Sequence, residues 1–234
     1  AAVEHFRQKR YSDADEFLVT LNPGAVVTFV AELSSPNLPQ VYLWDPAAYK
    51  DTVNSYTLFR GIVIGIAGLL ALFLTVLFVV KGTSMFPATA ALAWAILAYI
   101  SIDFGFLSRI VDISPGTEQL WRAGTEVALA ATFVVFLFAY LNLARWHNHF
   151  SYGMLGWILG LVIIAGVAVF DPPIAAGIAR ISFAATAIIG LGLIAYLGMQ
   201  GYDRAIMLVP SWLMVLVWLS GAWMAVTGTL DNDI

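Results

Sequence analysis

Six long apolar runs dominate the chain from residue 57 onward. Their spans are approximately 57–80, 86–107, 117–144, 152–170, 174–199 and 205–229. About 20 apolar residues cross the hydrocarbon core of a bilayer as a helix, so each run predicts a transmembrane helix. The first run contains no charged residue between Gly61 and Val80. The connections are short, and we therefore expect consecutive helices to be antiparallel neighbours.

The residues before these runs follow a different pattern. Apolar and polar residues alternate over Glu16–Leu21 and Val26–Leu33, with an Asn-Pro-Gly turn signal between them. A third run, Leu38–Trp44, follows a second turn-like segment. Alternation with a period of two is typical of half-buried strands, and Pro and Gly favour the turns between them. The pattern predicts a β-meander of about three strands.

The expected fold class is membrane all-α: a polytopic bundle of six visible transmembrane helices, with a short N-terminal extracytoplasmic β-meander. We divide the chain into a β-rich arm at residues 1–52, a helical bundle at 53–230 and a membrane-boundary tail at 231–234. An even number of spans places both ends on one side of the membrane. A seventh helix after Ile234 would return the chain to the other side.

Composition supports the membrane assignment and excludes several functions. Hydrophobic residues make up 61% of the chain and charged residues 11%, whereas soluble domains carry about 25% charge. The net charge of −4 and the lack of a basic patch argue against nucleic acid as a partner. The absence of cysteine removes disulfides, Fe–S clusters and thiolate catalysis. The polar stretch Glu4–Asp15 is not a signal peptide.

No catalytic, cofactor or metal motif is recognisable. The chain has no phosphate-binding loop, nucleophile elbow or HExxH sequence. His147 and His149 lie two apart beside a helix end, which is a poor metal site and favours an interfacial loop. We therefore expect no cofactor, no metal and no catalytic residue. Whether the protein is an enzyme stays open, because an enzymatic output domain would lie beyond Ile234.

The distribution of basic residues predicts the orientation. With the arm outside, the inner loops contain Lys81, Arg145 with His147 and His149, and Arg204. The outer loops then contain Arg109 and Asp112, then Asp171, then Asp231 and Asp233. Basic residues are enriched in cytoplasmic loops. The pattern predicts that the N-terminal arm lies outside the membrane and that the loops at Lys81, Arg145 and Arg204 lie inside.

Two helices carry closely spaced glycines. The first has Gly61, Gly65 and Gly68, and the fourth has Gly153, Gly156 and Gly160. Small residues about four apart allow helix backbones to approach closely in lipid. The spacing favours packing inside the bundle, and the alternative is the contact face of a homodimer.

Charged residues within the apolar runs are the candidate functional residues. They are Arg60, Asp103, Arg122, Glu126 and Arg180. Charges in hydrocarbon are unfavourable and usually face a partner or water. Arg122 and Glu126 are four apart and share one helical face. We expect an intramembrane ion-pair network, which either fixes helix packing or serves as a ligand or signal-coupling site.

A resemblance adds to this interpretation. The residues that carry it are Leu21, Pro23, Gly24 and Thr28, then Ser34 and Ser35, then Leu38, Pro39, Tyr42, Leu43, Trp44, Pro46 and Ala48. The helix that opens with Leu58-Phe59-Arg60-Gly61 follows directly. This order resembles the bacterial seven-transmembrane receptors with diverse intracellular signalling modules. In that family a periplasmic jelly-roll-like domain precedes seven helices, and a cytoplasmic output domain follows.

The resemblance implies a sensory module of the bacterial inner (cytoplasmic) membrane with a periplasmic N-terminus. Such a module couples a periplasmic signal to a cytoplasmic output absent from this chain. Family outputs are often enzymes of cyclic-dinucleotide turnover or histidine kinases. The implied partners are the lipid bilayer and an unknown periplasmic ligand, and a homo-oligomer or a larger membrane complex is a further candidate. Two alternatives remain open: an accessory subunit of a larger membrane complex, and a small transporter or channel.

Overall fold

The structure is a computed structural model that describes residues 3–10, 15–21, 28, 45–81, 83, 85–107 and 115–226. Contacts divide the chain into two compact units, Ala1–Gly61 and Ile62–Ile234. The outer-loop residues Arg109 and Asp112 and the tail at 231–234 lie outside the described residues. The two units are described separately below.

The first unit contains a two-stranded antiparallel hairpin. Strand β1 (Val3–Arg10) pairs with β2 (Asp15–Leu21), in a register that runs from Val3 opposite Leu21 to Arg10 opposite Asp15. Strand β2 coincides with the first alternating run, whereas β1 lies in the polar stretch, for which the pattern predicts no strand. The partner strand and its environment, more than intrinsic propensity, decide strand formation. The predicted strands at 26–33 and 38–44 lie outside the described residues, except Thr28, which has no regular secondary structure.

Helix α1 (Pro46–Val80) begins well before its apolar run. The Asp45 carboxylate accepts hydrogen bonds from the backbone N–H groups of Ala47 (2.9 Å) and Ala48 (3.3 Å). Asp at the cap and Pro at the first helical position are favourable helix starts. Pro46 and Ala48, which belong to the resemblance pattern, therefore stand in the first turn of a helix. At 1.5 Å per residue α1 is about 52 Å long, well over the ~30 Å hydrocarbon core.

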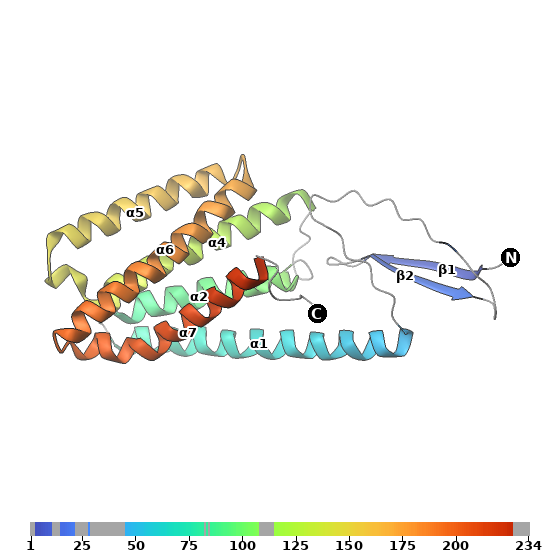
Figure 1. Cartoon of the computed structure of the whole chain (residues 1–234), viewed down its shortest axis with the longest axis horizontal. Coiled ribbons are helices and arrows are strands. Elements are labelled where there is room, and N and C mark those ends of the chain that lie inside the picture. The colour runs from blue at the N-terminus through green and yellow to red at the C-terminus, as the bar shows by residue number, and fades with distance from the viewer. Residues whose placement is uncertain are drawn as a thin grey trace. The chain divides into compact units, whose positions relative to one another are not determined.

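The second unit continues α1 and adds five further long helices. They are α2 (Met85–Asp103), α4 (Pro115–Leu141), α5 (Asn148–Val167), α6 (Pro172–Met199) and α7 (Asp203–Val226), with a short 3-10 turn η1 (Leu143–Arg145) before α5. Figure 1 shows these helices running back and forth along a common direction. Six helices of the described residues are long and apolar enough to cross a membrane, which confirms the six predicted spans.

Helix α4 lies at the centre of the second unit. It contacts α2, α5, α6 and α7. Its contact with α6 is made by small residues: Ala123 and Ala130 of α4 and Ala175 and Ala179 of α6 are at most 1% exposed. Small side chains let helix backbones approach closely, which is the main packing device where lipid removes the hydrophobic driving force.

The predicted glycine packing is wrong for most of the glycines. Within the part of the chain that the structure describes, a Cβ placed at Gly61, Gly65, Gly153, Gly156 or Gly160 would meet no atom within 4 Å beyond its own helix backbone and chain neighbours. At Gly68 it would only touch the Leu97 side chain at 4.0 Å. The spacing of glycines shows that one face of a helix is narrow, but it does not show whether another helix packs on that face. The close approach in this bundle uses alanines instead.

An aromatic stack joins α4, α6 and α7. The ring centroids of Phe133 lie 4.4 Å from Phe183 and 5.1 Å from Trp212. Trp212 is 1% exposed, and its indole N–H donates to the backbone carbonyl of Ala187 at 2.7 Å. Gly190 makes room for this indole, because a Cβ there would overlap Trp212 Cζ2. Gly190 is thus a packing position, as its location within a helix indicates.

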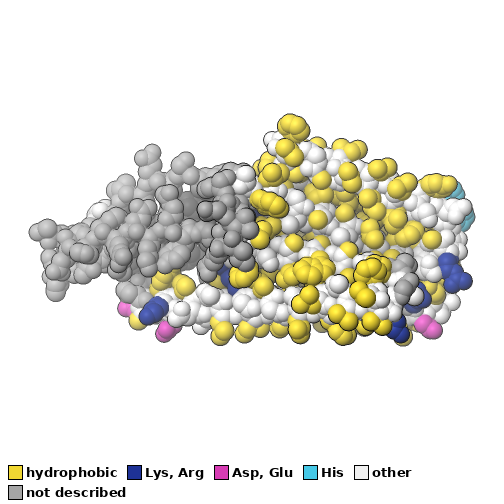
Figure 2. Space-filling model, turned by 180° about the vertical axis from the view of Figure 1, so that it is seen from behind, with side chains coloured by type: hydrophobic (Ala, Val, Ile, Leu, Met, Phe, Trp, Pro, Cys, Tyr) yellow, Lys and Arg dark blue, Asp and Glu magenta, His cyan; other side chains and the backbone are white. Residues whose placement is uncertain are grey.

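The outward faces of the helices are strongly apolar. Leu69, Ile163 and Met214 are each at least 69% exposed to the surroundings of the chain. On the face in Figure 2, hydrophobic side chains cover the middle of the helices, and charged side chains and histidines lie toward their ends. Such a surface is stable against lipid tails rather than water. The protein is an integral membrane protein.

Candidate functional site

Four of the five predicted membrane charges meet at one end of the bundle. This is the end at which α2 ends and α4 and α6 begin, and we call it the Asp103 end. Asp103 is the last residue of α2, Arg122 and Glu126 lie on α4, and Arg180 lies on α6. The network therefore draws on three helices.

Local helix geometry explains why these residues share a level. At 1.5 Å per residue, Arg122 lies about 10 Å and Glu126 about 16 Å from the start of α4, and Arg180 lies about 12 Å from the start of α6. Each helix has a clear start. At the start of α6 the Asp171 carboxylate accepts a hydrogen bond from the Ile174 N–H at 3.2 Å. Helix α4 begins at Pro115, a residue that favours the first turn of a helix. The alanine contact then brings α4 and α6 together at this level.

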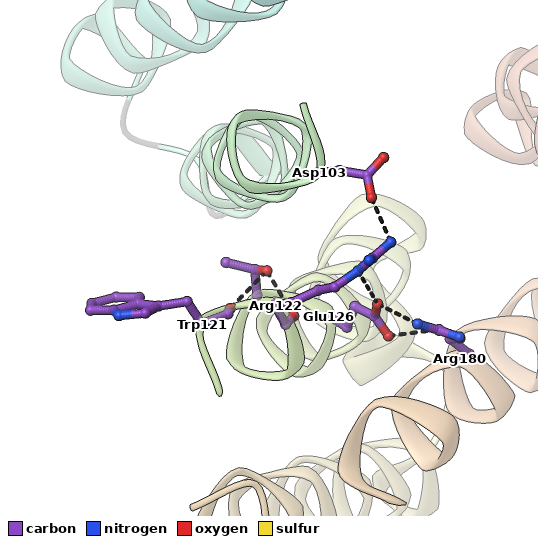
Figure 3. Close-up of polar contacts among 6 residues, drawn as sticks. Asp103, Trp121, Arg122, Glu126 and Arg180 are labelled. Carbon is purple, nitrogen blue, oxygen red and sulfur yellow. Dashed lines mark hydrogen bonds and ion pairs between the residues drawn. The ribbon is translucent and has the colours of Figure 1, made fainter. Parts of the chain in front are cut away.

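The four side chains form a continuous chain of ion pairs (Figure 3). Arg180 forms a two-point fork with Glu126, in which Nε donates a hydrogen bond to Oε2 at 2.7 Å and Nη2 donates one to Oε1 at 2.7 Å. Arg122 lies 3.7 Å from the same Oε1 through its Nε, and its Nη2 donates to Asp103 Oδ1 at 2.6 Å. Bidentate arginine–carboxylate pairs are the strongest of the charge-assisted hydrogen bonds.

Burial is unequal along this chain. The Glu126 side chain is 5% exposed, whereas Asp103 is 34%, Arg122 51% and Arg180 63% exposed. The buried carboxylate is compensated by two guanidiniums, as a charge in a low-dielectric site requires. The pair between Asp103 and Arg122 is the accessible end of the network and rests on a single short hydrogen bond.

Tyr99 belongs to the same site, although the sequence analysis missed it. It lies one helical turn before Asp103 on α2, and its phenol interacts electrostatically with Asp103, Glu126, Arg122 and Arg180. The signal was present in the sequence, because residues four apart share a helix face. A tyrosine in an apolar run is so common as a packing or interface residue that the spacing alone did not single it out.

Arg60, the fifth candidate, has a different setting. It lies on α1 in the first unit, and its guanidinium carbon sits 4.4 Å from the ring centroid of Tyr56, one turn earlier. A cation over an aromatic face is a favourable contact. The structure therefore gives Arg60 a local aromatic contact on its own helix.

The chemistry available to the site is ionic rather than covalent. It contains two carboxylates, two guanidiniums and a phenol, and no nucleophile with an adjacent base. Among the described residues no group of three or more His, Cys, Asp or Glu could hold a metal ion. His147 and His149 stack on each other with ring centroids 4.7 Å apart, beside the start of α5. The network can hold three helices together and can exchange one charged partner for another.

Comparison with known proteins provides one match. The family described as 7TM diverse intracellular signalling matches residues 56–234. No curated protein and no solved structure matches the chain. The family match starts within α1 and includes every apolar segment and all four residues of the ion-pair network. The chain therefore belongs to the 7TM diverse intracellular signalling family.

Proposed function

We propose that this chain is the membrane part of a bacterial inner-membrane receptor, which couples a periplasmic signal to a cytoplasmic output domain. The observation that carries this proposal is the ion-pair network at the Asp103 end, which links α2, α4 and α6. Family membership supplies the signalling role. The network supplies a place where an outside event can act on several helices at once.

The orientation supports this assignment of roles. The opposite end of the bundle carries the basic residues Lys81, Arg145 and Arg204. Basic residues favour the cytoplasmic side of a membrane, so we place that end in the cytoplasm. The Asp103 end then faces the periplasm, on the same side as the N-terminal arm. A seventh helix after Ile234 would carry the chain back to the cytoplasm, where an output domain acts, for example in cyclic-dinucleotide turnover.

The proposed mechanism is a shift between two helix arrangements. A ligand changes an equilibrium only by as much as it binds one arrangement better than the other. The exposed pair between Asp103 and Arg122 joins α2 to α4 by one hydrogen bond, while the buried fork between Glu126 and Arg180 joins α4 to α6 by two. Opening the exposed pair would remove this tie between α2 and α4, which also pack on each other. The fork between α4 and α6 would stay in place.

The test is the output of the full-length receptor. The reading frame should continue past Ile234 into a further apolar run and a soluble signalling domain, whose activity is then assayed in cells. Asp103→Asn should change the basal output about fivefold or more, since couplings between sites are typically 1–3 kcal/mol. Arg204→Gln, at the other end of the bundle, is the matched control and should leave the output unchanged.

Two results would contradict the proposal. One is a reading frame without a seventh apolar run or a soluble signalling domain. The other is an output that neither Asp103→Asn nor Arg122→Gln changes in a receptor that still reaches the membrane. Either result would favour an accessory subunit, in which the network serves only to hold the helices together.

A further inference from the structure

The arginines of the network have unused hydrogen-bonding capacity. Arg122 uses Nε and Nη2, and Arg180 also uses Nε and Nη2. Among the residues that the structure describes, neither Nη1 takes part in a hydrogen bond or ion pair. Each guanidinium carries five N–H donors in a planar fork. Both side chains are more than half exposed.

The two guanidiniums flank one carboxylate oxygen. Both approach the same oxygen of Glu126, Arg180 Nη2 at 2.7 Å and Arg122 Nε at 3.7 Å. In Figure 3 the two arginines extend from α4 and α6 toward this carboxylate from different sides. Because both guanidiniums lie next to one carboxylate oxygen, a small anion bound at their exposed edges would be attracted by both positive charges.

At the depth of this site, direct contact of the arginine side chains with lipid tails is unfavourable. Arg122 and Arg180 lie about 10–12 Å along helices that are about 40 Å long, which places them near the edge of a ~30 Å hydrocarbon core. An arginine within hydrocarbon is unfavourable unless it meets water, a carboxylate or a phosphate. Glu126 and Asp103 occupy only one edge of each guanidinium. The open edges fit a further acceptor group.

We infer that Arg122 and Arg180 form a binding site for an oxyanion, a carboxylate or phosphate group, which replaces Asp103 on Arg122. The incoming group offers Arg122 the same chemistry as the Asp103 carboxylate, so the exchange preserves a charge-assisted hydrogen bond. Asp103 is partly exposed and lies at the last residue of α2, where it can turn toward water. Glu126 stays in place because it is buried and held by two arginines.

This inference rests on the proposed function for its role in signalling, but binding is measured on the purified protein without any output. The protein is placed in nanodiscs of phosphatidylcholine and titrated with inorganic phosphate or acetate at constant ionic strength. A second set of nanodiscs contains phosphatidylglycerol and no added anion. The thermal unfolding midpoint reports binding, because a ligand that binds only the folded state raises it.

Asp103→Asn is the decisive variant. It removes the internal competitor and should tighten anion binding about tenfold, since one charge-assisted hydrogen bond no longer has to be exchanged. Arg122→Gln should weaken binding about tenfold or more, and Arg204→Gln should have no effect. A purely structural network would show no tightening in Asp103→Asn.

The outcomes separate the sources of the anion. Stabilisation by soluble phosphate or acetate in phosphatidylcholine identifies a soluble ligand, and stabilisation by phosphatidylglycerol alone identifies a lipid headgroup. Both support the site if the Asp103 and Arg122 variants act as stated. No response in either membrane, or a response that these variants do not alter, overturns it. If binding is found but the output of the receptor does not depend on the network, the proposed function fails and the binding site stands.

Discussion

At the residue scale, Glu126 determines the character of the network. Its carboxylate is nearly inaccessible, yet it lies about 16 Å along a membrane helix. A charged side chain at this depth is unfavourable by about 2.5–3.5 kcal/mol on insertion scales. Arg180 and Arg122 compensate it from two sides. Removing one member of such a buried pair is therefore far worse than removing both.

Arg180→Gln should lower the free energy of unfolding by about 3–5 kcal/mol, because it leaves the buried Glu126 carboxylate without its two-point partner. The double variant Glu126→Gln/Arg180→Gln should recover most of this loss, since both charges are then gone. Unfolding of the protein in detergent micelles, followed by circular dichroism, measures both. Glu118→Gln, an exposed position in the first turn of α4, is the control and should stay within about 0.5 kcal/mol of wild type. A double variant as unstable as the sum of its singles would show that the pair is not coupled.

The sequence revealed part of this site at the residue scale. The spacing of four between Arg122 and Glu126 follows from helix geometry, and the charges stand out against apolar runs. Which arginine pairs with which carboxylate was not predictable. Whether Arg180 meets Glu126 or Asp103 depends on how α6 is rotated against α4, and no local pattern carries that rotation. Tyr99 was missed because a tyrosine in an apolar run is commonly a packing residue, so its spacing from Asp103 did not single it out.

At the element scale, the contact between α6 and α7 depends on one glycine. Trp212 occupies the space that a side chain at Gly190 would need, and it hydrogen-bonds the Ala187 carbonyl one turn away. Gly192, two residues later, faces no atom within 4 Å. The two glycines of the same helix thus have opposite roles, and substituting each separates packing from helix propensity.

Gly190→Ala should lower the free energy of unfolding by about 1–3 kcal/mol, because the new methyl group overlaps the indole and forces the helices apart. Gly192→Ala should leave it unchanged or raise it by up to about 1 kcal/mol, since alanine is the better helix former. Thermal unfolding of both variants in the same detergent provides the comparison. Equal effects at the two positions would mean that Trp212 does not pack against Gly190.

Hydropathy predicted the existence of the six helices but not their ends or contacts. The apolar run of α1 starts at residue 57, whereas the helix starts at Pro46 because Asp45 caps it. The glycines of α1 and α5 attracted attention as packing positions, yet the tight contact lies between alanines of α4 and α6. A membrane helix tolerates a small residue on a lipid face as well as on a packed one, so spacing alone does not distinguish them.

At the scale of the whole molecule, the helices of the second unit are held with unequal strength. Helices α4, α6 and α7 share the aromatic stack, and α4 and α6 also share the alanine contact. Helix α2 packs on α4, and the indole of Trp94 on α2 donates to Thr75 on α1 at 2.9 Å. The pair between Asp103 and Arg122 ties the end of α2 to this frame. We therefore expect α2 to be the helix that shifts when the pair opens.

The transmembrane spans were predictable from the sequence, because the lipid bilayer restricts which structures can cross it. A bilayer admits helices whose backbone groups are satisfied internally, so long apolar runs translate directly into spans. The orientation remains a prediction from the basic residues. The hairpin of β1 and β2 was not predicted as such, because the polar sequence of β1 carries no alternating apolar face and becomes a strand through its pairing with β2.

The most direct test of the account is the distance between α2 and α6 at the end of the bundle opposite the Asp103 end. The chain has no cysteine, so spin labels attached at Thr83→Cys and Met199→Cys, both exposed, report this distance by pulsed electron resonance without background. Asp103→Asn should move the distance distribution by about 1–2 Å or more, the size of helix shifts in signalling proteins. Glu118→Gln should not move it. Identical distributions in wild type, Asp103→Asn and Arg122→Gln would contradict the account, because the network would then fix the bundle without controlling its arrangement.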